Sequence, residues 1–242
     1  MLAVGNDLIA HLPRKDRIRL LAACEPVPLA LSDVLGEPGD ITRHVYFPTT
    51  GFISLVAMLE GSPGVEVGMV GREGMVGAEV VLGVDTTPLH AVVQGAGAAL
   101  RIGAPRFRTE LARSPAMREC LGRYLYVLMA QLATSAACLR FHQIGPRLAR
   151  WLLMSQDRAH SDHFHVTHEF LAYMLGVRRV GITVAAVALQ RDGLIDYHRG
   201  DFEVIDRIGL EAAACGCYAA GQRAYAEFIR APVASADARL PG

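Results

Sequence analysis

Two patterns of hydrophobic residues divide the chain. Between residues 25 and 102, short segments rich in β-branched residues alternate with turn sequences such as PTTG, EGSPG and GREG. Many short strands at regular turn spacing are typical of an antiparallel sandwich or a barrel-like roll. Further along, apolar positions recur every three or four residues, which is the spacing of helices. The pattern therefore predicts an α+β protein with an N-terminal antiparallel β-roll.

Short helices are predicted to precede the roll. Asn6 is a suitable N-cap for a helix over LIAHL, and a second helix over RKDRIRLLAAC restarts after a proline. The second helix places Ile18, Leu20 and Leu21 on its apolar face. We group these helices with the roll as one domain, residues 1–108.

A long helix is predicted from about Pro115 to Arg140, in the segment 109–141. At 1.5 Å per residue it is roughly 39 Å long. Small or apolar residues recur along it as a heptad seam with one irregular step. We expect this seam to form a dimer interface, and burial in the helix's own domain is the alternative. The seam consists of Met117, Leu121, Tyr124, Leu128, Leu132, Ser135 and Leu139.

The most specific pattern lies in the third predicted domain, residues 142–208. Thr167 is a good N-cap for a short helix that Gly176 ends, a second helix starts near Arg178, and two strands surround Arg199. This order is a helix-turn-helix with an appended wing. The second helix can enter the major groove, and its N-terminus can meet a phosphate. We assign the contacts with double-stranded DNA to Thr167, His168, Arg178, Arg179, Val180, Thr183 and Arg199.

Composition restricts how such a protein can bind and where it works. The chain has 24 basic and 24 acidic residues, and this zero balance excludes recognition by bulk positive charge, so any DNA contact must be local. Five scattered cysteines fit reduced thiols in a cytoplasm. We see no secretory signal, and the uncharged run 124–139 is too short and too polar to span a bilayer. We expect a cytoplasmic protein without a membrane partner.

Several stretches together resemble the Crp/Fnr family of bacterial transcription regulators. They are HVYFPTTGFISLV, GREGMVGAEVVLG, IGPRLARWLLMSQDR and VTHEFLAYMLGVRRVGITVAAVALQRDGLIDYHRGDFEVID, and the resemblance covers about residues 5–220 in order. It implies a roll like a cyclic-nucleotide-binding domain, a homodimer paired along the long helix, and an inverted-repeat operator read by two winged domains. It also implies an effector at the roll and RNA polymerase as a further partner. The last predicted helix, from Leu210 to about Ile229 within residues 209–230, looks like the C-terminal extension of a subgroup, and we expect a flexible tail at 231–242.

This sequence departs from the family pattern at the effector site. Family members that bind cyclic nucleotides use a Gly-Glu pair and an Arg-Ser pair, whereas this chain has Gly77-Ala78 and no arginine between Arg72 and Arg101. A phosphate without a cationic fork loses its strongest interaction, so we expect no tight binding of cyclic AMP. The candidate effector pocket consists of Gly77, Ala78, Glu79 and His90.

Two further departures concern the iron–sulfur centre and the operator. The oxygen-sensing branch of the family holds an iron–sulfur cluster on N-terminal cysteines, but this chain has only Cys24 there, so no cluster is expected. The familiar readers carry a glutamate and an arginine on the recognition helix, where this chain has Val180 and Val184. The operator should therefore differ from the familiar half-site.

The remaining motifs favour structural roles. We interpret the four histidines from His160 to His168 as a polar linker, and Cys215-Gly-Cys217 as structural, so we predict neither a metal site nor a cofactor. No nucleophile motif is present, and we expect no enzyme activity. Two alternatives stay open: a small-molecule sensor that signals through protein contacts with a degenerate DNA surface, and a cupin-like metal enzyme.

Overall fold

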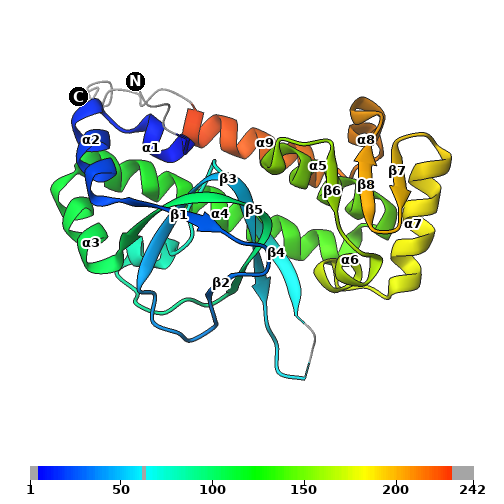
Figure 1. Cartoon of the computed structure of the whole chain (residues 1–242), viewed down its shortest axis with the longest axis horizontal. Coiled ribbons are helices and arrows are strands. Elements are labelled where there is room, and N and C mark those ends of the chain that lie inside the picture. The colour runs from blue at the N-terminus through cyan, green and yellow to red at the C-terminus, as the bar shows by residue number, and fades with distance from the viewer. Residues whose placement is uncertain (1–4, 62–63, 231–242) are drawn as a thin grey trace, which may run out of the picture.

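The computed structural model describes residues 5–61 and 64–230. The β-roll lies at one end of an elongated molecule and the winged domain at the other, and helix α4 runs between them (Figure 1). The C-terminal helices return along α4 toward the first helices of the chain, where Ile229 packs beside Leu8 and Ile9. The predicted tail at 231–242 lies outside the described residues.

Two helices precede the roll, as predicted. Helix α1 spans Asp7–His11 and α2 spans Arg14–Ala23, and the side chain of Asn6 accepts a hydrogen bond from the backbone of Ile9. The Asn6 amide also donates to the carbonyls of Pro48 and Gly74, at 2.9 Å each, which attaches α1 to the roll. The expectation for Ile18 was wrong: it faces solvent, because α2 packs through Leu20 instead.

The roll is an antiparallel sheet with strand order β1-β5-β3-β4, and β2 also pairs with β5. The prediction of short strands was wrong for two of them, since β3 and β5 have 14 residues each. The expected PTTG turn lies inside β3, where the register shifts and the strand bends instead of ending. A Cβ on Gly51 would lie 2.3 Å from the carbonyl oxygen of Gly95, so this bend requires glycine. The elements are β1 Glu25–Leu29, β2 Val34–Gly36, β3 His44–Ala57, β4 Val65–Val70, a 3-10 helix Ala78–Leu82 and β5 His90–Gly103.

The long helix is confirmed as α4, Pro115–Phe141. Ser114 caps it by accepting from the backbone of Met117 at 3.0 Å, and Pro115 occupies the first turn. A separate helix, α3 (Ala104–Arg113), precedes it, so the segment 109–141 holds the end of one helix and the whole of another. Both helices pack on the roll in one core with Phe47 and Phe107.

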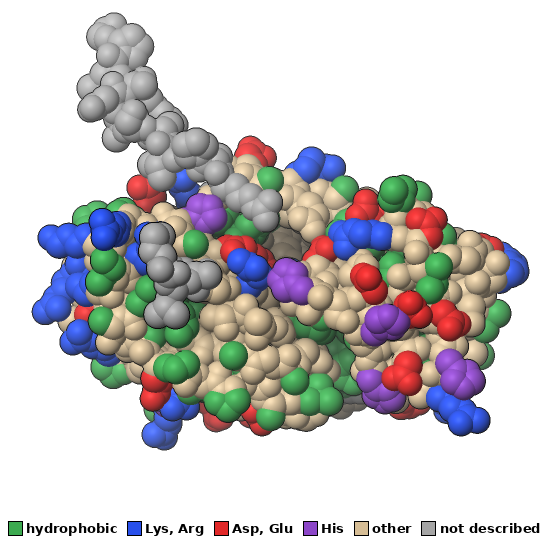
Figure 2. All heavy atoms as spheres, turned by 45° about the horizontal axis from the view of Figure 1, so that its top comes forward, with side chains coloured by type: hydrophobic (Ala, Val, Ile, Leu, Met, Phe, Trp, Pro, Cys, Tyr) green, Lys and Arg blue, Asp and Glu red, His purple; other side chains and the backbone are tan. Residues whose placement is uncertain are grey.

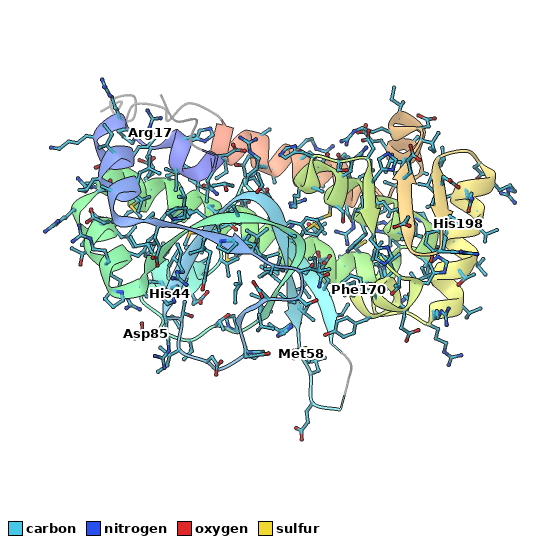
Figure 3. The ribbon with its side chains drawn as sticks, viewed as in Figure 1. Arg17, His44, Met58, Asp85, Phe170 and His198 are labelled. Atoms are coloured by element: carbon cyan, nitrogen blue, oxygen red, sulfur yellow. The ribbon has the colours of Figure 1, made fainter. Side chains whose placement is uncertain are left out.

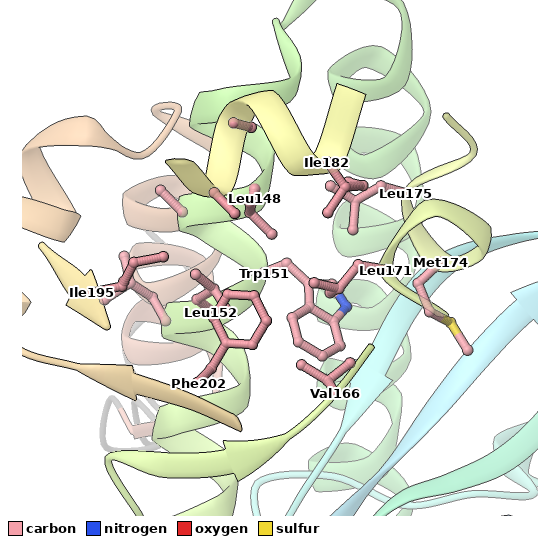
Figure 4. Close-up of a cluster of buried hydrophobic side chains, with 14 of the residues drawn as sticks. Leu148, Trp151, Leu152, Val166, Leu171, Met174, Leu175, Ile182, Ile195 and Phe202 are labelled. Atoms are coloured by element: carbon pink, nitrogen blue, oxygen red, sulfur yellow. The ribbon is translucent and has the colours of Figure 1, made fainter. Parts of the chain in front are cut away.

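The winged domain follows the predicted order. It consists of α5 Ile144–Ala159, β6 His163–His165, α6 His168–Leu175, α7 Arg179–Arg191, β7 Ile195–His198 and β8 Asp201–Val204. The stretch interpreted as a linker is a third strand, β6, which pairs with β8. Trp151 lies at the centre of the core, between Leu171 of α6 and the wing (Figure 4). Roll residues Phe52, Val56 and Met69 join the same core, so the two domains pack directly on each other.

The C-terminal extension differs from the prediction. The single helix expected from Leu210 to about Ile229 is broken: α8 spans Arg207–Ala213, α9 spans Cys217–Tyr225, and a π-helical turn follows at Ala226–Arg230. The break arises because Ala214 is extended and the backbone N–H of Cys215 donates to the carbonyl of Pro146 at 3.1 Å.

Candidate nucleic-acid interface

The turn between α6 and α7 positions the recognition helix. Gly176 has a φ of +61° and ends α6, with its N–H donating to the carbonyl of Tyr173 at 3.1 Å. The two helices meet at a bend of 109°. Glycine adopts this left-handed conformation without the cost that a side chain would add. As a result α7 lies at the outer edge of the molecule, remote from the roll (Figure 1).

Helix α7 has one buried and one exposed face. Its buried face, Ile182, Ala185, Ala186 and Leu189, packs on α5 and α6 as predicted. Its outer face carries the predicted residues Arg178, Arg179, Val180 and Thr183, all exposed. Val184 and Val187 also lie on that face. The exposed fractions of Val180, Val184 and Val187 are 66%, 66% and 59%. The assignment of contacts omitted Val184 and Val187, although helical spacing from Val180 could have found them.

His168 connects three elements of the domain. Its ring stacks on Tyr197 of the wing with centroids 4.3 Å apart, and its Nδ1 lies 3.0 Å from the hydroxyl of Thr183. Burial lowers the pKa of His168, and the nearby Arg179 lowers it further, which favours the neutral ring. His168 is thus placed to hold α6, α7 and the wing together, while Thr167 caps α6 and stays exposed.

The wing presents Arg199 at its tip. Arg199 and Gly200 both have positive φ, and Arg199 is exposed next to His198, which lies in the winged domain (Figure 3). His163 and His165 each face a carboxylate on β8, namely Glu203 at 3.4 Å and Asp201 at 2.8 Å. Histidine and acidic side chains accordingly lie side by side at this end of the surface (Figure 2). His163, His165 and His168 therefore contact three different residues, Glu203, Asp201 and Tyr197.

The four residues of the candidate effector pocket have separate neighbours. Gly77 is in a left-handed conformation, and Ala78 is buried. Glu79 accepts a hydrogen bond from Thr42, and the His90 ring lies 2.8 Å from a carboxylate oxygen of Glu37. A cavity of about 1340 Å³ lies elsewhere, between α4, α5 and α9, and none of the four lines it. Its walls include Arg158, Asp157, Gln131, Tyr218 and Gln222.

The predicted dimer seam faces mainly inward. Met117, Leu121, Tyr124 and Ser135 are buried within the described chain, and Leu128, Leu132 and Leu139 are partly buried. In the first half of the seam, Met117, Leu121 and Tyr124 are buried against the roll, as the alternative interpretation predicted. A second heptad stripe lies on the exposed face and consists of Gly122, Tyr126, Met129, Ala133 and Ala136.

Helix α4 is long and apolar enough to cross a membrane by length and composition alone, with a mean hydropathy of 1.2 over its best 18 residues. Only 17% of that window is buried inside the protein. The core helices of soluble proteins meet the same criterion, so this feature alone does not indicate a span. It does show that α4 exposes apolar surface, including Met129 at 61% and Phe141 at 76%.

The chain resembles known proteins in two ways: one domain matches a family model in sequence, and the fold as a whole matches solved structures. Residues 146–213 match the family model of the Crp-like helix-turn-helix domain. No curated protein matches the chain in sequence.

Three solved regulators illustrate the likeness of fold. The c-di-GMP responsive global regulator CLP of Xanthomonas campestris is 20% identical, with a TM-score of 0.65 over 79% of this chain and 99% of that one. FixK2 of Bradyrhizobium japonicum is 12% identical, with a TM-score of 0.67 over 79% and 98%. A CRP/FNR family regulator of Thermus thermophilus is 22% identical, with a TM-score of 0.59 over 78% and 98%. The described chain thus has the fold of the Crp/Fnr family of transcription regulators, and its DNA-binding part is a Crp-like helix-turn-helix domain.

Proposed function

We propose that the protein is a homodimeric transcription regulator that binds an inverted-repeat operator in double-stranded DNA. The observation that supports this most is α7, whose outer face is exposed at the edge of the molecule while its inner face is held by the Trp151 core. An α-helix presented in this way fits the major groove. RNA polymerase is the further partner that a regulator of this fold would address.

The chemistry of α7 indicates how it would read DNA. Arg178 and Arg179 lie at the N-terminus of the helix, where the helix dipole also favours phosphate. The stripe of Val180, Val184 and Val187 offers methyl groups to the groove, and thymine is the base that presents a methyl group there. We therefore expect an operator half-site with thymines under this stripe.

The exposed stripe on α4 supports the homodimer. Gly122, Ala133 and Ala136 are small, so two copies of α4 can approach closely, and Met129 supplies apolar area. Pairing along this face would leave the inward residues Leu121 and Tyr124 on the roll. Met129→Glu should convert the dimer to a monomer in analytical ultracentrifugation without loss of helicity. Leu82→Glu, on an equally exposed apolar residue of the roll, is the control, and an unchanged dimer in the Met129 variant would contradict this face.

Control by an effector is also part of the proposal. The cavity between α4, α5 and α9 supports an effector site there, because a ligand in it would touch the long helix, the winged domain and the extension together. CLP is c-di-GMP responsive, and that dinucleotide is a first ligand to test. Cyclic AMP should not raise the thermal midpoint of unfolding, because no arginine lies between Arg72 and Arg101 to hold its phosphate.

Selection of bound DNA from a random pool tests the proposal, followed by titration of the selected operator. Replacing both Arg178 and Arg179 by alanine should weaken binding about 100-fold or more. Each lost phosphate contact should also reduce the salt dependence by about 0.9 in the slope of log K against log salt. Arg14→Ala, at the other end of the molecule, is the matched control. Equal binding by the double variant would favour the alternative, a sensor that signals through protein contacts.

A further inference from the structure

Four ligand-type side chains converge where α4 ends. Cys138 and His142 are four residues apart, so they lie on one face of the last turn of α4, and His142 is its C-cap. Cys215 lies in the break between α8 and α9, and Cys217, on the other side of Gly216, is the first residue of α9. The break brings these two thiols to the end of α4, although Cys138 and Cys215 are 77 residues apart in the chain.

The distances suit a tetrahedral metal site. The four ligand atoms all lie within 4.8 Å of one another. The Sγ atoms of Cys138 and Cys215 are 3.6 Å apart, and the Sγ of Cys217 is 3.5 Å from the Nδ1 of His142. Zinc bonds of about 2.3 Å to sulfur and about 2.0 Å to nitrogen, at tetrahedral angles, separate neighbouring ligand atoms by about 3.5 to 3.8 Å. The Cys138–Cys215 and Cys217–His142 pairs have this separation.

We propose that Cys138, His142, Cys215 and Cys217 form a structural Cys₃His zinc site. Three thiolates and one neutral imidazole are a ligand set that zinc prefers, and four protein ligands close the coordination sphere. Binding releases the thiol protons to solvent. The three thiolates and the ion together carry one negative charge. Arg147, which is buried, and Arg150 are near enough to interact electrostatically with the thiols and offset that charge.

The local backbone supports this arrangement. The N–H of Cys215 donates to the carbonyl of Pro146 in α5, which anchors the break beside the start of the winged domain. His142 directly precedes Gln143, the N-cap of α5. Zinc would therefore join the C-terminal extension to the junction between the long helix and the winged domain. A disulfide between Cys138 and Cys215 is the competing chemistry, but it would leave Cys217 and His142 without a common role.

Metal analysis of the untagged full-length protein, purified under reducing conditions, tests the site. We expect about one zinc per chain, and Co²⁺ added to the metal-free protein should give the visible bands of tetrahedral thiolate coordination. His142→Ala and Cys217→Ser should each lower the affinity for Co²⁺ at least tenfold. These two ligands are the less buried ones, so their replacement should leave the fold intact by circular dichroism.

Cys120→Ser and Cys24→Ser are the matched controls, because both thiols lie outside the cluster. They should bind Co²⁺ as the unaltered protein does. The proposal is overturned if the reduced protein binds no stoichiometric metal, or if the ligand variants and the controls bind it equally. If the protein binds no metal but forms a disulfide between Cys138 and Cys215, these two residues are a redox pair instead.

Discussion

Two of the contacts between the roll and the rest of the chain differ in chemistry. Its contact with α4 is a conventional core, in which Leu121 and Tyr124 pack near Phe107 and the Tyr124 hydroxyl donates to the carbonyl of Met75 at 3.1 Å. Its contact with the winged domain also buries apolar residues, but Glu66 of β4 lies within it, only 9% exposed.

The surroundings of Glu66 determine the pKa of its carboxyl group. Ser54 donates to its carboxylate, and Arg150, Trp151 and Arg158 of α5 interact with it from the winged side. Burial nevertheless dominates and raises the pKa of Glu66 to about 7. We therefore expect the strength of this contact to change with pH near neutrality, whereas the contact with α4 should depend on packing. In the proposed regulator, this titratable contact is the one that joins the roll to the winged domain.

The largest expected effect is in the α4 contact. Leu121→Ala should lower the free energy of unfolding by about 2 to 5 kcal/mol, because it removes buried methyl groups and leaves a cavity. The loss, measured by urea denaturation, should be the same at pH 5.5 and pH 8. Leu82→Ala, at an exposed leucine, is the control and should change the stability little. A loss at Leu121 that varied with pH would show that this contact is also titratable.

Glu66→Gln addresses the second contact. The folded state holds the Glu66 proton up to about pH 7, whereas the unfolded chain releases it near pH 4.5, so stability should fall as the pH rises between these values. Above pH 7 the accumulated cost is at most about 3.4 kcal/mol. Glutamine cannot ionise, so the variant should be more stable than the original protein at pH 8 and should lose the part of the pH dependence that comes from Glu66. Unfolding curves at pH 5.5 and pH 8 measure this.

The exposed Glu60→Gln is the control for the Glu66 variant and should retain the pH dependence of the original protein. If the Glu66 variant instead loses stability at pH 8, the carboxylate is charged in the fold and held by the arginines of α5.

Local spacing allowed the winged domain to be predicted. Thr167, Gly176 and the inner face of α7 depend on residues within a few positions of each other, and all three predictions are confirmed. The face of α4 was predicted less well, because a long helix of small and apolar residues carries two heptad stripes, and only the roll decides which one is buried. The Cys₃His cluster was missed because its halves come from distant segments, so neither half has a recognisable spacing on its own.

Gly176→Ala tests the contact between the winged domain and the roll, and its expected effect is smaller than that of Glu66→Gln. An added Cβ would need a left-handed backbone and would lie 3.0 Å from Cγ2 of Val65 on the roll, so a loss of about 1 to 2 kcal/mol in unfolding free energy is expected. Gly193 separates the two causes, since it has a φ of +72° but no atom of the described residues within 4 Å of an added Cβ. Gly193→Ala should therefore show the backbone cost alone, about 1 kcal/mol.

The difference between the two alanine variants measures how tightly the turn of the winged domain rests on Val65. If the contact with the roll holds the domain in place, Gly176→Ala should lose more stability than Gly193→Ala, and Val65→Ala should remove the excess. Equal losses in the two glycine variants would mean that the winged domain moves away from the roll at little cost. The roll would then restrain the winged domain mainly through α5 and the contact around Glu66.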